Sequence, residues 1–82
     1  MIYRAELSKK VFGQLGNFPP AAFDALVRVM SWVIEYPDDP LRSFPTADPA
    51  TRIAEFGGAG LVTFEIDDAR QVVTLTDVTW AG

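Results

Sequence analysis

Residues 51–80, TRIAEFGGAGLVTFEIDDARQVVTLTDVTW, constrain the fold of this chain more than any other stretch. They predict three consecutive strands, because β-branched and aromatic residues are separated by two turn segments, GGAG and DDAR. In the middle strand, alternation places Val62, Phe64 and Ile66 on one face. This pattern is typical of a sheet that is covered by helices on one side.

The N-terminal half predicts a strand and a short helix. Residues 2–7 alternate well enough for a strand. Ser8 fits the N-cap of a helix over residues 9–15, which Gly13 weakens and a Gly-Asn pair ends. The two elements precede the longer helix and the three strands in the chain.

A longer helix is predicted from about residue 21 to residue 36. Pro19 and Pro20 suit its first turn, and Pro37 ends it. A stripe at i, i+3, i+4 spacing faces the core and consists of Phe23, Leu26, Val27, Met30, Val33 and Ile34. Another largely apolar face carries Ala22, Ala25, Val29, Trp32 and Tyr36. Since one sheet cannot cover so wide an arc, the first helix or a partner protein packs on the extra face.

Residues 37–50 form a loop with four prolines. The prolines predict an extended, stiff connection without regular structure. A loop of this length inside a compact domain is often functional.

Composition limits the chemistry. The 82 residues predict one domain over residues 1–82, and they include no cysteine and no histidine, so we expect no metal site and no cofactor. The net charge of −4 disfavours binding to phosphate backbones. Residues 1–10 lack the order of a signal peptide, and no segment is apolar for long enough to cross a membrane. We therefore expect a soluble cytoplasmic protein.

Three segments resemble the RelE/ParE superfamily of bacterial toxins, and together they cover nearly the whole chain. YRAELSKKVFGQL is similar to the opening strand and first helix of those toxins. NFPPAAFDALVRVMSWVIEYPDDP is similar to their long second helix and the proline loop after it. The last segment, TRIAEF followed by LVTFEIDDARQVVTLTDVTW, is similar to their meander. The resemblance implies an α+β fold of order β-α-α-β-β-β, with an antiparallel sheet packed against two N-terminal helices.

The resemblance also implies functions. RelE-like members are ribosome-dependent mRNA endonucleases, ParE-like members inhibit DNA gyrase, and an antitoxin protein usually holds both types inactive. The nucleases use cations on the central sheet and a basic or phenolic residue near the C-terminus. Here Arg52 matches an arginine of the second strand, but Leu61 and Trp80 stand where basic residues are common. Arg42, in the proline loop, is the other candidate.

Each candidate also has a structural interpretation. Arg52 can pair with Glu65 or Asp77 across the sheet instead of contacting phosphate. The glycine-rich turn lacks the Lys-Ser/Thr of a phosphate-binding loop and joins two strands. The candidates for partner binding are apolar and aromatic, namely Trp32, Val29, Tyr36 and Trp80. For the two tryptophans, packing in the core is the competing interpretation.

Three functional hypotheses follow. The first is a RelE/ParE-like toxin component of a type II toxin-antitoxin system with a reduced or lost nuclease site, which acts by binding an antitoxin, itself or a target protein. The second is an active ribosome-dependent mRNA endonuclease that uses Arg52 and Arg42 as catalytic residues. The third is a gyrase inhibitor, which requires no catalytic residue.

Overall fold

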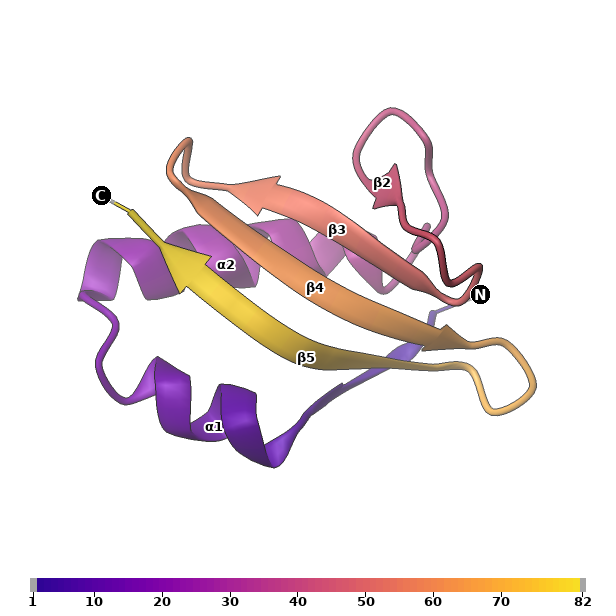
Figure 1. Cartoon of the computed structure of the whole chain (residues 1–82), viewed down its shortest axis with the longest axis horizontal. Coiled ribbons are helices and arrows are strands. Elements are labelled where there is room, and N and C mark those ends of the chain that lie inside the picture. The colour runs from indigo at the N-terminus through magenta and orange to yellow at the C-terminus, as the bar shows by residue number, and fades with distance from the viewer. Residues whose placement is uncertain (1, 82) are drawn as a thin grey trace.

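The structure, a computed structural model, describes residues 2–81. The structure contains two helices and five strands (Figure 1). Four of the strands and both helices follow one another in the predicted order, and the fifth strand is a short one that was not predicted. The elements are β1 (Arg4–Leu7), α1 (Lys9–Leu15), α2 (Pro20–Val33), β2 (Phe44–Pro45), β3 (Thr51–Phe56), β4 (Gly60–Asp67) and β5 (Val72–Trp80). The chain therefore has the predicted α+β fold. No helix among the described residues is long and apolar enough to span a membrane.

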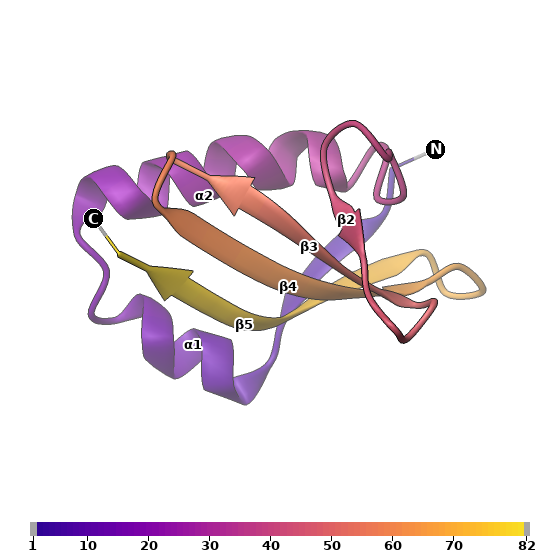
Figure 2. The ribbon, with the colours of Figure 1, turned by 45° about the horizontal axis from the view of Figure 1, so that its top comes forward.

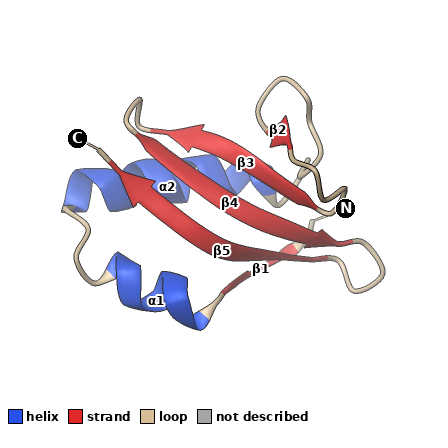
Figure 3. Cartoon of the chain, in the orientation of Figure 1, coloured by secondary structure: helices blue, strands red, loops and turns tan. Residues whose placement is uncertain are grey.

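The five strands form one mixed sheet of order β1-β5-β4-β3-β2. Strands β3, β4 and β5 are the predicted antiparallel meander, and β2 adds to it antiparallel. Strand β1 differs from the expected antiparallel sheet, because it lies parallel to β5 (Figure 3). Parallel neighbours need a long connection, which the two helices and the rest of the meander provide.

One face of the sheet packs against both helices. In Figure 2, α2 runs along the sheet, and α1 lies beside β5 at the opposite border. The buried core cluster joins one residue of α1 and two of α2 to seven residues of the meander. Its members are Val11, Leu26, Val33, Ala54, Phe56, Val62, Phe64, Val73, Leu75 and Val78. The predicted inward positions of Val62 and Phe64 are confirmed, since both side chains are buried.

A β-bulge in β5 keeps its later residues on the core face. Thr63 pairs with Asp77 while Phe64 pairs with Leu75, so Thr76 is the extra residue. Without this insertion, Leu75 and Val78 would point to opposite faces, because side chains alternate along a regular strand. The bulge therefore allows both to be buried.

Three predicted boundaries are different in the structure. The first strand begins at Arg4 instead of residue 2, since its pairing with β5 starts with Arg4 opposite Val72. Helix α2 ends at Val33, three residues before the predicted end. The loop of residues 37–50 contains a strand, β2, and was therefore wrongly predicted to lack regular structure. Its proline is compatible with pairing because β2 is an edge strand.

Candidate binding groove and the open sheet face

Strand β1 forms an edge of the sheet, and its outer side is unpaired within the described residues. The N–H groups of Arg4 and Ser8 donate to β5 or the turn before it, at Gln71 and Leu75. Because backbone groups alternate in direction along a strand, Ala5 and Leu7 direct their N–H and C=O groups to the outer side. All four residues of β1 are exposed. The outer backbone groups of Ala5 and Leu7 therefore have no strand partner within the described residues, while the neighbouring Tyr3 N–H donates to Ile34.

An apolar groove of about 360 Å³ lies between β1 and α2. Serine is the only polar residue type in its lining, which comprises Ala5, Leu7, Leu15, Phe23, Leu26, Val27, Met30, Ser31, Ile34 and Leu75. Phe23 and Val27 are 41% and 54% exposed. Exposed apolar residues that gather in a concavity are typical of a site for an apolar ligand or partner.

Helix α2 is rotated about its axis relative to the predicted orientation, so that predicted core residues line the groove. Phe23 and Val27 were assigned to the core stripe, and this was wrong, because both are exposed. Leu26 and Val33 of the same stripe are buried, as is Ala22 of the extra face. The helix is thus rotated so that its small residues approach the sheet and part of its bulky stripe lines the groove. Periodicity alone gives the width of an apolar arc but not which part of it the sheet covers.

Arg52 lies on the helix-covered face of the sheet. Its Nε donates to the Ser43 hydroxyl at 2.6 Å, and its Nη2 donates to the Ser43 carbonyl at 2.8 Å. The expected pairing with Glu65 or Asp77 is not formed, because the register places Arg52 opposite Phe64 and Thr51 opposite Glu65. Arg52 therefore fastens the proline loop to β3 in this structure.

Arg42 lies over the aromatic ring of Trp32. Its guanidinium carbon lies 5.0 Å from the centroid of the Trp32 ring, within the range of a cation–π interaction. The two candidate catalytic residues thus both connect residues 37–50 to the body of the fold. A catalytic role for Arg52 and Arg42 stays a prediction.

The open face of the meander carries acidic but not basic side chains among the described residues of β3, β4 and β5. Glu55 and Glu65 project there with a series of threonines, and Leu61 opens β4 on this side with 45% exposure. A hollow of about 470 Å³ borders the face and is lined by four acidic residues, Asp48, Glu65, Asp67 and Asp68, against one basic residue, Arg70. Such a surface repels the phosphate backbone of nucleic acids.

The four predicted partner-binding residues have different environments. Val29 and Trp32 are partly buried and pack against the core cluster. Trp80 does so too and stacks on Phe56, with 5.6 Å between ring centroids. Tyr36 is 63% exposed, just beyond the end of α2. Of the four, Tyr36 therefore offers the most surface to a partner, and partner contacts by the set stay a prediction.

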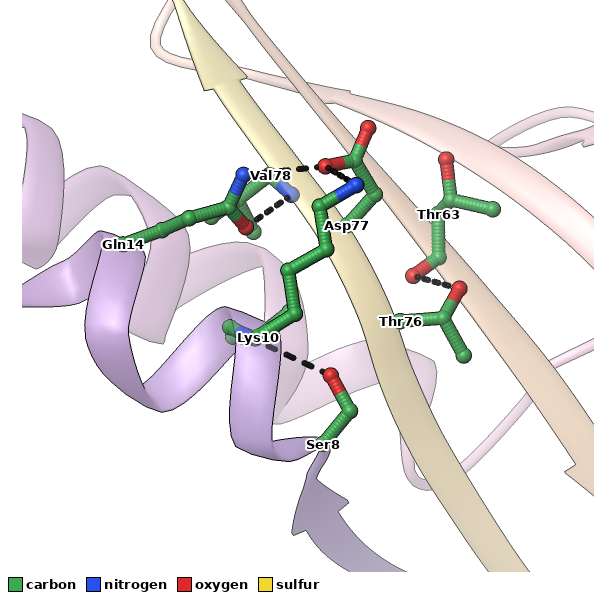
Figure 4. A network of polar contacts seen from close by, with 8 residues as sticks. Ser8, Lys10, Gln14, Thr63, Thr76, Asp77 and Val78 are labelled. Carbon is green, nitrogen blue, oxygen red and sulfur yellow. Dashed lines mark hydrogen bonds and ion pairs between the residues drawn. The ribbon is translucent and has the colours of Figure 1, made fainter.

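A polar network that sequence reasoning missed holds α1 against β5 (Figure 4). The Gln14 side chain donates to the Asp77 carboxylate at 3.0 Å and accepts from the Val78 N–H at 3.1 Å. Lys10 lies 3.1 Å from the same carboxylate. Because β1 ends opposite Leu75, this part of β5 has no strand on the side away from β4, and Gln14 occupies the hydrogen-bonding position there instead.

Two pKa values are shifted by side-chain hydrogen bonds, one in this network and one at Tyr3. The hydrogen bond from Gln14, followed by that from Lys10, lowers the pKa of Asp77 below its ordinary value of 3.8. A hydrogen bond to Asp68 raises the pKa of the Tyr3 phenol. The Tyr3 hydroxyl connects the start of the chain to the β4–β5 turn through this bond.

Comparison with solved structures shows that this chain has the fold of RelE toxins. A chain of the toxin-antitoxin complex RelBE2 from Mycobacterium tuberculosis superposes with a TM-score of 0.84 at 19% identity, covering 99% of this chain and 100% of that one. A mutant of the E. coli toxin RelE, solved with a peptide of the antitoxin RelBc, gives a TM-score of 0.86 at 14% identity over 100% of this chain and 86% of that one. No protein-family model and no curated protein sequence matches the chain. The predicted RelE/ParE-like fold is confirmed.

Proposed function

We propose that this chain is a RelE-like toxin component of a type II toxin-antitoxin system, that it acts in the cytoplasm, and that it works by binding protein instead of cleaving RNA. The open sheet face carries this proposal. It lacks cations on the described residues of β3, β4 and β5, and an acidic hollow borders it. Developing charge on phosphate would find no stabilising partner on that surface.

The groove between β1 and α2 supports the protein-binding half of the proposal. Both structural neighbours were solved in complex with an antitoxin or an antitoxin peptide. An antitoxin segment with apolar side chains would bury Phe23 and Val27, which the chain alone leaves exposed. Burial of apolar side chains is the main source of affinity at such sites, at roughly 25 cal/mol per Å² before the cost of association is subtracted.

Binding is tested by coexpression with the product of the neighbouring reading frame, followed by affinity purification and calorimetry. Val27→Asp places a charge in the groove, and we expect it to weaken the complex at least about a hundredfold. Phe12→Asp is the matched control, because Phe12 is 74% exposed on α1 and does not line the groove. Equal loss in both variants, or loss in neither, would count against the groove as the antitoxin site.

Activity is tested by induced expression in a bacterial host, with primer extension on ribosome-bound messages and a DNA supercoiling assay. We expect intact messages. Codon-positioned cleavage that disappears in Arg52→Ala would instead establish the alternative, an mRNA endonuclease that uses Arg52 and Arg42. Loss of supercoiling without cleavage would establish the gyrase-inhibitor alternative, which the lack of cations on the open face does not oppose.

A further inference from the structure

An apolar strip crosses β2, β3 and β4 on the open face of the sheet. Phe44 and Ile53 are directly opposite each other in the register, and Ile53 is opposite Thr63 on β4. Leu61 is two residues before Thr63 and is therefore a diagonal neighbour of Ile53 on the same face. Phe44 is 52% and Leu61 45% exposed, and Ile53 is partly exposed. These three side chains leave apolar surface in contact with water.

Carboxylates flank the strip on both sides. Glu55 lies two residues after Ile53 on β3 and opposite Leu61. Glu65 lies on the other side, opposite Thr51, which is two residues before Ile53. The two carboxylate-bearing rows are thus four residues apart along β3, or roughly 13 Å. Both glutamates are exposed, and neither forms an ion pair with a described residue.

The cations that border this face are already paired. Arg4 lies 3.4 Å from Glu6 on β1, and Arg70 lies 4.0 Å from Asp67. The hollow beside Glu65 is predominantly acidic as well. The open face therefore combines an apolar centre with a negatively charged rim. An apolar centre inside a polar rim is the usual arrangement of a protein–protein interface.

We propose that the open face docks a basic amphipathic segment of a partner protein. Apolar side chains of this segment cover Phe44, Ile53 and Leu61, and lysine or arginine side chains beside them pair with Glu55 and Glu65. Charge complementarity selects this occupant. The carboxylates repel the phosphates of a nucleic acid, and a second copy of the same face would bring like charges together. The open face is on the opposite side of the sheet from the groove, so this inference does not rest on the proposed function.

Fluorescence anisotropy with a labelled helical peptide tests the proposal. The peptide has leucine on one face and lysine on both flanks, because a helix with its side chains is about 10–12 Å wide and fits between the two rows of carboxylates. A second peptide has glutamate in place of every lysine. We expect only the lysine peptide to bind the purified chain. Its affinity should fall as salt is added, because salt screens charges at the rim of an interface.

The charge contacts are tested with a matched pair of double variants. E55Q/E65Q should weaken binding of the lysine peptide by at least about tenfold. D24N/E35Q removes the same charge from exposed positions on α2 and just after it, on the other side of the sheet. We expect that variant to change the affinity by less than about threefold. Equal losses in the two variants would show a general effect of net charge and would overturn the proposal.

The apolar contacts are tested with Phe44→Ser, which should weaken binding by at least about fivefold. Phe12→Ser is the matched control, because Phe12 is 74% exposed on α1, and it should leave the affinity unchanged. Thermal unfolding monitored by circular dichroism checks that each variant is folded, and if Phe44→Ser is not, the charge variants decide. Absence of binding by the lysine peptide, or equal binding of the two peptides, also overturns the proposal.

Discussion

Arg52 and Ser43 form a two-point contact in which one guanidinium donates to both the hydroxyl and the carbonyl of the serine, at 2.6 and 2.8 Å. Ser43 is only 3% exposed and is the buried polar residue of the proline loop. The contact lies next to the pairing of Pro45 with Arg52 in the sheet. The arginine that most resembles a toxin active-site residue therefore acts here as the anchor of residues 37–50.

We expect Arg52→Ala to lower the free energy of unfolding by about 1–3 kcal/mol, because charged hydrogen bonds are lost and a buried serine loses a donor. Urea unfolding measures this change, and limited proteolysis should show faster cleavage within residues 37–50. Arg28→Ala, on an exposed position of α2, is the control and should change the free energy by less than about 0.5 kcal/mol. Equal effects of both substitutions would refute the anchoring role.

Stability should fall in acid through Asp77. The pKa of Asp77 is lower in the folded protein than in the unfolded chain. The stabilisation from its carboxylate is therefore fully present above the pKa of the unfolded chain, and it is lost as the pH falls through the pKa of the folded protein. The free energy of unfolding should therefore decrease below about pH 4, as the carboxyl group is protonated. Asp77→Asn should flatten that decrease, as measured by urea unfolding between about pH 2 and pH 7. Asp24→Asn, at an exposed position of α2, should leave the profile unchanged.

Two glycine-to-alanine substitutions should change the free energy of unfolding in opposite directions. A Cβ at Gly60 would lie 2.5 Å from the Phe56 ring, so Gly60→Ala should lower the free energy of unfolding by about 1–3 kcal/mol. A Cβ at Gly13 meets no atom within 4 Å. Because Gly13 is inside α1, Gly13→Ala should raise the free energy by about 0.5–1 kcal/mol. Thermal unfolding of both variants measures the contrast, and a shift in the same direction would contradict it.

The groove and the network around Asp77 could not be read from the sequence for the same reason. Phe23 and Val27 have the spacing of core residues, and only the docking of α2 on the sheet leaves them exposed. Gln14 and Asp77 are separated by 63 residues, and no local pattern relates them. Each feature depends on how two elements approach one another.

The sequence by itself determined the elements of this protein apart from β2, their order and the inward face of β4. Those properties arise from local causes, namely capping by Ser8, interruption by proline and glycine, and the alternation of Val62 and Phe64. Only the tertiary structure decided the face of Arg52, because a shift of one residue in strand register moves a side chain to the opposite face. It also decided that β1 lies parallel to β5 with an open outer edge, since strand partners distant in sequence are chosen by the packing of the whole chain.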